Sequence, residues 1–188
     1  MYNDTMIIAE VKPKSPNFVS EKSWDELFEI AVSVGDWISI HTHEWWGGSF
    51  ELIAKARSRT KKPILAKGFH ETDEDVKRAL LMGADYVLMV GRMPNIHQDK
   101  CLIEPYTVEE LLKIPDGLKC VWNSRDMRAL ISGRKESPRK SFEDVRVLCP
   151  DVWLCQASNL KTAQDISKGA DAVLVGTNLE TFAQSLCS

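Results

Sequence analysis

The chain has 188 residues, 27% of them charged, and a formal net charge of -3 at pH 7. This length suits one well-buried domain, expected to span residues 1–188, and is too short for two. Acidic and basic residues are interspersed, which excludes a broad electrostatic attraction to nucleic acid or to an anionic membrane. A small anionic ligand could still be held by local lysines.

The sequence carries no targeting or membrane-spanning pattern. Its first residues lack a basic-then-apolar signal, and no apolar run approaches the roughly 20 residues that a membrane helix needs. The five cysteines are scattered, without the close pairs that metal sites and redox dithiols use. We therefore expect a cytoplasmic protein with reduced thiols, no metal site, and no nucleic-acid or membrane partner.

Short apolar runs recur along the chain and predict eight strands. Several are separated by amphipathic stretches, which is the pattern of a parallel sheet built from strand–helix units. The runs cover residues 7–11, 37–41, 64–67, 86–90, 101–104, 119–122, 152–155 and 172–175.

Two of the connections predict helices clearly. Within residues 50–60, Leu52, Ile53 and Ala56 share one face. Residues 72–82 begin with a threonine cap and an acidic first turn, and the stretch stops at Gly83. Both connections therefore predict a strand–helix–strand unit.

Eight strands with intervening helices predict a compact (β/α)8 TIM barrel of the α/β class, smaller than the roughly 250 residues such barrels usually occupy. Segment 91–100 is too short and too rich in Pro and Asn for a crossover helix, so we expect the helix after the fourth strand to be missing. An open doubly wound sheet is the alternative. It would normally carry a glycine-rich phosphate loop after an early strand, and this sequence has none.

Polar residues close several of the predicted strands, where a barrel of this kind carries its catalytic groups. Glu10 and Lys12 end the first strand and, being two residues apart, project to the same face. Alone they could be a surface ion pair, since isolated Lys and Glu are usually solvated. Lys67, Glu104 and Asn123 end the third, fifth and sixth strands, so we expect all five groups at one end of the barrel.

The eighth strand ends in the turn Gly176-Thr177-Asn178, whose backbone N–H groups and threonine hydroxyl could meet a phosphate. Such a turn is often only a turn. Together with two lysines and two glutamates, it predicts a site that binds a phosphorylated, carboxylated substrate and moves protons.

At these residues the sequence resembles the indole-3-glycerol phosphate synthase family of barrel enzymes, over nearly the whole chain. The first strand looks like the family's Glu-x-Lys-x-x-Ser-Pro signature, here formed by Glu10, Lys12, Ser15 and Pro16. Further similar stretches are residues 38–50, with the second strand and an aromatic loop, 63–69, with the third-strand lysine, and 102–104, 123–126 and 171–177.

The resemblance implies a lyase of tryptophan biosynthesis that needs no cofactor. Such an enzyme closes the indole ring of 1-(2-carboxyphenylamino)-1-deoxyribulose 5-phosphate. Carbon dioxide and water are lost, and indole-3-glycerol phosphate is formed. The implied substrate is therefore a phosphorylated, carboxylated aromatic molecule.

The resemblance also implies roles for particular residues. Lys67 would be the general acid that protonates the substrate carbonyl, and Lys12 would pair with the anthranilate carboxylate and supply a proton for dehydration. Glu10 and Glu104 would act as base and as stabilisers of the developing cation, and Asn123 would orient the intermediate. The implied binding residues are Ser15, Gly176 and Thr177 at the phosphate, Trp46 and Phe69 around the aromatic ring, and Pro16 and Ser158 as further substrate contacts.

Some stretches differ from the family pattern. The family usually has a leading segment before its first strand, whereas here that strand is expected to start at about Met6, so we expect a barrel lacking this extension. Gly68 stands where the family usually has Asp. In the seventh strand, either Ala157 or Ser158 takes the position of the family's serine. The loop with Trp45 and Trp46 beside two histidines, His41 and His43, is interpreted as aromatic packing at the barrel mouth.

Other functions stay open at this point. The chain could be a non-catalytic barrel relative that binds an indole-like or anthranilate-like ligand or a partner chain, or it could be a different sugar-phosphate isomerase or lyase. The missing fourth helix would leave one flank of the barrel exposed, so a homodimer or a partner chain covering that flank is also expected.

Overall fold

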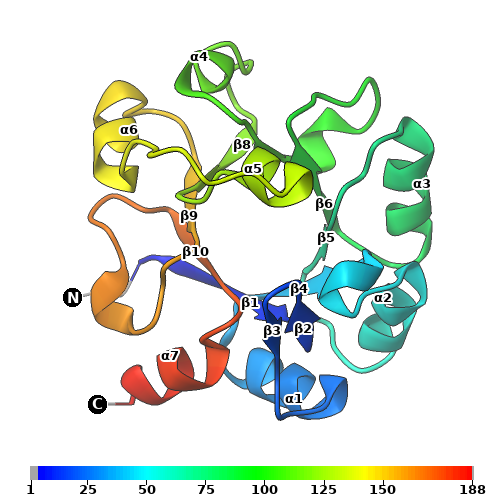
Figure 1. Cartoon of the computed structure of the whole chain (residues 1–188). Helices are drawn as coiled ribbons and strands as arrows, with labels where there is room; N and C mark the ends of the chain where they lie inside the picture. The colour runs from blue at the N-terminus through cyan, green and yellow to red at the C-terminus, as the bar shows by residue number, and fades with distance from the viewer. Residues whose placement is uncertain (1–3, 188) are drawn as a thin grey trace.

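A computed structural model describes residues 4–187, while residues 1–3 and 188, the two ends of the predicted domain, lie outside the described part. Eight parallel strands form a closed barrel with helices around it (Figure 1). The barrel closes because β1 pairs with both β4 and β10, and the predicted (β/α)8 architecture is confirmed. The barrel strands are β1 (Met6–Val11), β4 (Trp37–His41), β5 (Ile64–Lys67), β6 (Tyr86–Val90), β7 (Cys101–Glu104), β8 (Lys119–Asn123), β9 (Leu154–Ala157) and β10 (Ala172–Val175).

Most of the helices lie around the outside of the ring, whereas α5 (Met127–Ser132) lies over the barrel (Figure 1). Three short 3-10 helices, η1 (Glu44–Trp46), η2 (Gln98–Lys100) and η3 (Ala163–Asp165), and a hairpin of β2 (Lys14–Ser15) and β3 (Phe18–Val19) complete the described elements. The α-helices are α1 (Trp24–Val34), α2 (Phe50–Arg57), α3 (Asp73–Leu81), α4 (Val108–Leu111), α5 (Met127–Ser132), α6 (Phe142–Leu148) and α7 (Leu179–Ser185).

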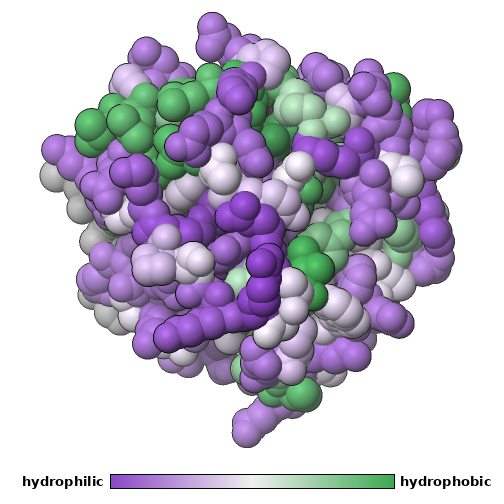
Figure 2. Space-filling model, turned by 45° about the horizontal axis from the view of Figure 1, so that its top comes forward, coloured by the Kyte–Doolittle hydropathy of each residue, from purple (hydrophilic) through white to green (hydrophobic). Residues whose placement is uncertain are grey.

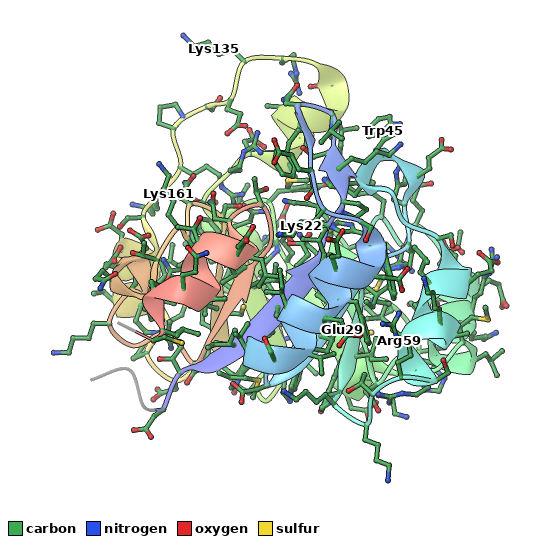
Figure 3. The ribbon with its side chains drawn as sticks, turned by 90° about the horizontal axis from the view of Figure 1, so that it is seen from below. Lys22, Glu29, Trp45, Arg59, Lys135 and Lys161 are labelled. Carbon is green, nitrogen blue, oxygen red and sulfur yellow. The ribbon has the colours of Figure 1, made fainter. Side chains whose placement is uncertain are left out.

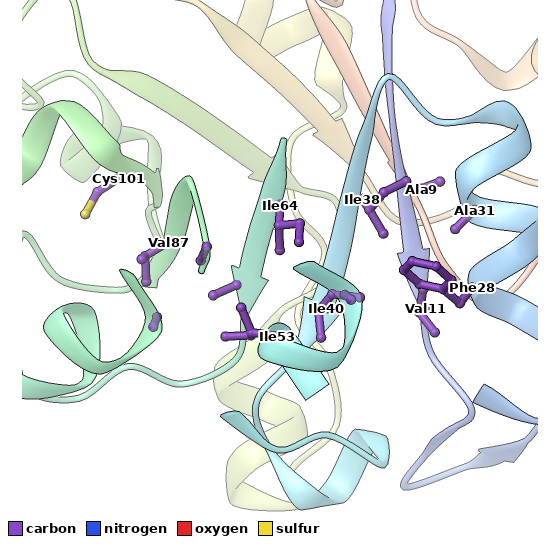
Figure 4. Close-up of a cluster of buried hydrophobic side chains, with 14 of the residues drawn as sticks. Ala9, Val11, Phe28, Ala31, Ile38, Ile40, Ile53, Ile64, Val87 and Cys101 are labelled. Atoms are coloured by element: carbon purple, nitrogen blue, oxygen red, sulfur yellow. The ribbon is translucent and has the colours of Figure 1, made fainter. Parts of the chain in front are cut away.

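Successive side chains of each strand point alternately into the barrel and outward to the helices, and both faces are buried. On the outer face, Val11 and Ile40 pack with Phe28 of α1 in a cluster of buried apolar side chains (Figure 4). On the inner face, residues such as Ile8 and Leu65 belong to a second apolar cluster that fills the barrel. The barrel is therefore a packed core rather than a pore.

Helix ends follow the capping signals in the sequence. Thr72 accepts a hydrogen bond from the backbone N–H of Asp75, whose side chain accepts one in return from the backbone of Thr72. The predicted helix 72–82 is thus confirmed as α3. The predicted helix 50–60 is confirmed as α2 but is shorter, because residues 58–60 turn back onto the carbonyls of Ala54 and Ala56.

Ion pairs bind neighbouring helices together on the outside of the barrel. Glu29 of α1 and Arg59, just after α2, lie side by side (Figure 3) and form an ion pair with an N–O distance of 2.5 Å. Lys55 of α2 reaches Asp25 of α1 at 2.9 Å. These pairs are exposed, so each contributes little to stability alone.

The connection between β6 and β7 contains no α-helix within the described chain, only η2, as predicted. Instead, Met93 and Ile96 pack against the outer core where a helix would lie. The predicted homodimer or partner chain at this flank stays a prediction. The connection between β9 and β10 is similarly reduced to η3, which the sequence did not reveal.

The seventh barrel strand lies two residues later than predicted, at Leu154–Ala157 instead of 152–155. The pairing explains the shift, because the backbone N–H of Leu154 bonds to the Asp171 side chain at 2.8 Å and Leu154 is the first residue in register with β8. Val152 and Trp153 are apolar but precede the ladder.

The two ends of the barrel differ in chemistry. At the amino-terminal ends of the strands, the rings of Trp37 and Tyr86 stack at 4.1 Å and Trp153 lies 6.4 Å from Trp37. At the other end, the β2–β3 hairpin and the loop bearing Lys135 rise above the strands (Figure 3). None of the helices within residues 4–187 has the length and apolar character needed to cross a membrane.

Candidate active site

Polar side chains from five strands, β1, β4, β5, β7 and β8, gather toward the carboxyl ends of the barrel. Most of them lie on the inner face at the last residues of their strands, above buried apolar residues, and Ser39 lies one step deeper, below His41. The register sets His41 of β4 directly beside Lys67 of β5, and Glu10 of β1 beside Ser39 of β4. The buried members of the group are Glu10, Ser39, His41, Glu104 and Asn123.

Glu10 is the centre of this group. Only 2% of its surface is exposed. Its Oε1 atom accepts a hydrogen bond from Lys67 Nζ at 3.1 Å and another from His41 Nε2. Its Oε2 atom points toward Gly176, where an added Cβ would lie 2.2 Å away. One carboxylate therefore reaches from the β4–β5 side of the site to the turn after β10.

The positive charges around Glu10 keep it ionised. Burial alone would raise its pKa, but Lys67, Lys12 and His41 together outweigh burial and hold the pKa of Glu10 well below its usual value. Burial lowers the pKa of Lys12, although the charge of Glu10 opposes the effect. Lys12 is thus an ammonium that gives up its proton more readily than a lysine in water.

His41 contacts this carboxylate as a neutral imidazole. Burial lowers its pKa to about 4, against the opposing charge of Glu10, so the contact is a hydrogen bond rather than an ion pair at neutral pH. The ring stacks on Trp46, with centroids 5.4 Å apart and planes 7° from parallel.

Glu104 forms a second polar chain on the opposite wall. Its Oε1 atom accepts a hydrogen bond from Asn123 Nδ2 at 2.9 Å, and Ser158 Oγ donates to Asn123 Oδ1 at 2.6 Å. Burial raises the pKa of Glu104, with Lys67 and Asn123 opposing the shift. Glu104 therefore takes up a proton more easily than Glu10 does.

A first cavity opens in front of these groups, and its wall combines aromatic and apolar side chains with polar and charged ones. Trp46, Phe69 and Leu88 form part of its wall, and His41, Lys67 and Glu104 supply polar groups. Met127 and Leu130 of α5 line it from the side. The aromatic packing predicted for the mouth loop is confirmed, since Trp46 and Phe69 meet edge to face at 5.3 Å and His43 contacts both rings.

A second cavity lies beside the first, over the turn after β10. It is lined by Glu10 and by the turn residues Gly176, Thr177 and Asn178, with Lys161 among the other lining residues. Both cavities share four lining residues, which are Lys12, Lys67, Arg125 and Ser158. The wider face around the mouth is mostly hydrophilic, with apolar patches between the polar side chains (Figure 2).

Most of the residues predicted for the site come together here, but two do not. Ser15 and Pro16 lie on or beside the β2–β3 hairpin and are not among the residues that line either cavity. Of the two candidates in the seventh strand, Ser158 brings a hydroxyl into both cavities. Ser158 and Asn159 both have left-handed backbone conformations, with φ values of 71° and 58°, a strained arrangement for residues other than glycine.

Three features of the site were not predicted from the sequence. Arg125 lines both cavities. It was not chosen as a site residue, although it lies in a stretch that the family resemblance covers. His41 ends its strand and lies two residues after Ser39, so both side chains point into the barrel. This alternation could have identified His41 as a site residue. The contribution of α5 depends on how the chain folds back over the mouth, which no local pattern indicates. Within the described chain, no three His, Cys, Asp or Glu side chains gather in a way that could hold a metal ion.

A closed (β/α)8 barrel with acid and base groups at the carboxyl ends of its strands is the arrangement of a TIM-barrel enzyme. A family model described as indole-3-glycerol phosphate synthase matches residues 2–111, and the chain belongs to that family. The match includes Glu10, Lys12, Lys67 and Glu104.

Individual relatives agree with the family. An indole-3-glycerol phosphate synthase of Ruminiclostridium cellulolyticum is 29% identical over 92% of this chain and 74% of its own length. Enzymes of the same name from Sulfurisphaera tokodaii and Aquifex aeolicus are each 28% identical, over 92% and 93% of this chain and 77% and 76% of their own lengths. These alignments extend the likeness beyond the segment that the family model matches.

Proposed function

We propose that the chain closes the indole ring of 1-(2-carboxyphenylamino)-1-deoxyribulose 5-phosphate and releases carbon dioxide, water and indole-3-glycerol phosphate. The observation that carries the proposal is the pair of adjoining cavities that share Lys12 and Lys67. An aromatic ring suits one cavity, a phosphate suits the other, and the reacting carbons would lie between them, beside both ammonium groups.

The first step forms the carbon–carbon bond. The ring carbon that bears the carboxylate attacks the ketone carbon, and Lys67 gives a proton to the ketone oxygen, which becomes a hydroxyl. Lys67 is partly buried and hydrogen-bonded to Glu10, so its ammonium is held in place for the transfer. Lys12, also within reach of both cavities, pairs with the substrate carboxylate.

The later steps remove carbon dioxide and water. The bond to the carboxylate breaks, and its electron pair restores the aromatic ring. The hydroxyl then leaves as water with a proton from Lys12, whose pKa is lowered by burial. One proton is then lost from the carbon beside the nitrogen, and Glu104, with its raised pKa, is the base that takes it. Glu10 remains a carboxylate that stabilises the developing cation.

Binding is assigned to the remaining groups. The turn Gly176-Thr177 offers backbone N–H groups and a hydroxyl to the phosphate, and Ser158 supplies a second hydroxyl beside them. Trp46 and Phe69 contact the ring of the anthranilate part. Asn123, fixed between Glu104 and Ser158, orients the intermediate. Ser15 stays a predicted phosphate contact and Pro16 a predicted substrate contact, and both would require the hairpin to approach the ligand.

The test is the appearance of indole fluorescence when the purified protein meets the substrate. Lys67→Met removes the proposed general acid while keeping the length of the side chain, so turnover should fall by about a hundredfold or more. Lys77→Met is a matched control, because Lys77 lies on the outer surface of α3, where it pairs with Glu74. The control should keep the activity of the unchanged protein.

Other results would lead elsewhere. Comparable activity in the Lys67→Met variant would refute the assignment of the general acid. An inactive protein that still binds the substrate or product by calorimetry would instead be a binding protein on the same barrel. A protein that neither turns over nor binds the substrate would contradict the proposed function.

A further inference from the structure

His41 is a buried side chain at the centre of the site that the reaction scheme above does not use. It is the last residue of β4, only 3% exposed, and it faces the inside of the barrel. Its register partner on the next strand is Lys67, so the imidazole and the ammonium stand side by side. Both are hydrogen-bonded to the same carboxylate oxygen, Oε1 of Glu10.

The protonation state of His41 follows from its contacts. An ionised carboxylate only accepts hydrogen bonds, so Nε2 of His41 must carry the hydrogen. With a neutral ring, Nδ1 is then an unprotonated acceptor, and it is a buried atom without a hydrogen-bond partner among the described residues. This single tautomer offers Glu10 a donor that carries no charge and does not titrate near neutral pH.

The surroundings hold the ring in one orientation. Trp46 stacks parallel to the imidazole on one side. The loop after η1 packs on the backbone of His41, where a Cβ on Gly48 would lie 2.3 Å from the carbonyl oxygen. An imidazole fixed in this way fixes the carboxylate that it contacts.

A fixed neutral donor matters at the moment when Lys67 loses its proton. The ion pair between Lys67 and Glu10 then becomes a contact with a neutral amine. We propose that His41 is a positioning residue that holds Glu10 in place and ionised while Lys67 is deprotonated. This inference rests on the proposed function, because it assigns His41 a part in the same acid–base cycle.

The groups that face Glu10 come from every strand around it. Lys12 directly follows the strand of Glu10, His41 belongs to β4, Lys67 to β5 and Glu104 to β7, and the backbone of Gly176 closes the side toward β10. Lys12 and Lys67 are the other favourable partners, and both have proton-transfer roles in the scheme. His41 is the partner whose hydrogen stays in place throughout.

Two variants separate the hydrogen bond from the space that the ring fills. His41→Gln keeps an N–H donor at about the reach of Nε2, whereas His41→Leu keeps the bulk and removes the donor. We expect His41→Leu to lower kcat by about tenfold or more, with KM nearly unchanged. In a plot of kcat against pH, the acid limb should move to higher pH, because Glu10 loses a donor that stabilises its ionised form. His41→Gln should restore kcat to within a few-fold and return the acid limb to its original position. His97→Asn, at a histidine in the β6–β7 connection, should behave like the unchanged protein.

Equal kcat values and equal acid limbs in the Leu and Gln variants would overturn the proposal. A direct measurement does not depend on activity or on the folding of the Leu variant. Nitrogen-15 NMR of the unchanged protein should show His41 as the neutral tautomer with hydrogen on Nε2 between pH 6 and pH 8. Hydrogen on Nδ1, or an imidazolium in that range, would refute the inference. If NMR shows the expected tautomer but the protein does not turn over the substrate, the proposed function fails and the hydrogen bond to Glu10 remains.

Discussion

Glu10 and Glu104 are both buried carboxyl groups at strand ends, yet their pKa values shift in opposite directions. Burial acts on each and would raise both. Glu10 is surrounded by Lys67, Lys12 and the His41 donor, which outweigh burial, whereas Glu104 has weaker opposition from Lys67 and Asn123. Pairs of acidic groups separated in this way commonly divide the work of catalysis. Glu10 is the permanent anion and Glu104 the group that can hold a proton.

The position of Glu10 depends on the absence of a side chain at residue 176. We predict that Gly176→Ala lowers kcat/KM by about a hundredfold, because a methyl group 2.2 Å from Oε2 must displace the carboxylate. Steady-state kinetics with the same substrate measure the loss. In Gly133→Ala, the added Cβ meets nothing within 4 Å, and only its left-handed backbone is strained. That control should lose stability but not kcat/KM, and an equal loss of activity in both variants would contradict the argument.

The buried neutral His41 also makes stability depend on pH. Its pKa is about 4 in the folded chain and about 6.5 in the unfolded chain, so the unfolded chain binds more protons between these values. The contribution of neutral His41 to the free energy of unfolding is fully present above the pKa of the unfolded chain. It is lost as the pH falls toward the pKa of the folded chain. We predict that the unfolding free energy of the unchanged protein falls by about 2 kcal/mol more than that of His41→Gln between pH 7 and pH 5. Urea unfolding at both pH values tests this, and parallel losses in the two proteins would refute it.

At the scale of elements, the β6–β7 connection replaces a helix with a loop tied to α3. Arg92 donates from Nε to the carbonyl of His70 and from Nη2 to Asp73, both at 2.9 Å. Asn95 also bonds to Asp73, so the first turn of α3 anchors the loop. The anchored loop then holds Met93 and Ile96 against the core.

Removing this anchor should weaken the fold more than removing a surface ion pair. We predict that Arg92→Met lowers the free energy of unfolding by about 2 kcal/mol, because two hydrogen bonds of a charged donor are lost in a half-buried place. Lys77→Met is the control, since the pair of Lys77 with Glu74 is exposed and its loss should change stability by less than about 0.5 kcal/mol. Thermal unfolding followed by circular dichroism compares the two, and equal shifts would argue against the anchor.

The strands and α3 could be predicted because short stretches of sequence determine them. The strands could be predicted because each is a β-rich run buried on both faces, and α3 because Thr72 and Asp75 cap it. The seventh strand was predicted two residues too early because Val152 and Trp153 are apolar. Its actual start depends on pairing with β8. The β2–β3 hairpin was not predicted, since it packs on the loop around Gly47, far along the chain.

The site could be predicted in part for the same reason. Glu10, Lys67 and Asn123 were identifiable because strand parity places them on the inner face at the mouth. His41 has the same parity, but the neighbouring tryptophans suggested packing, and its bond to Glu10 depends on β4 lying beside β1. The pKa directions could not be predicted either, because they depend on which charges surround each carboxylate.

At the scale of the whole molecule, the strand ring joins both ends of the chain. β1 pairs with β10, the last barrel strand, and with β4 on its other side. The family model covers residues 2–111, yet β8, β9 and β10 are needed to close the ring and bring Asn123 and Gly176 to the site. We therefore propose that the predicted domain folds as one unit.

We predict a single cooperative unfolding transition. Tryptophans lie in both halves of the ring, with Trp37 and Trp46 in the first half and Trp122 and Trp153 in the second. Denaturation curves from tryptophan fluorescence and from far-ultraviolet circular dichroism should coincide, as they do for a two-state domain. Separate midpoints, or a second transition in either signal, would indicate two independent units.

The wall that the two cavities share has a consequence for the design of inhibitors. An aromatic carboxylate in one cavity and a short alkyl phosphate in the other would draw on the same ammonium groups, Lys12 and Lys67. As separate fragments they would compete for charge, so their affinities should not simply add. A tether that matched the span between them would make the second contact intramolecular and could raise affinity by about a hundredfold or more, whereas one that was too short would lose the gain. The length of the tether, more than the strength of either anion, would then decide how tightly such a molecule is held.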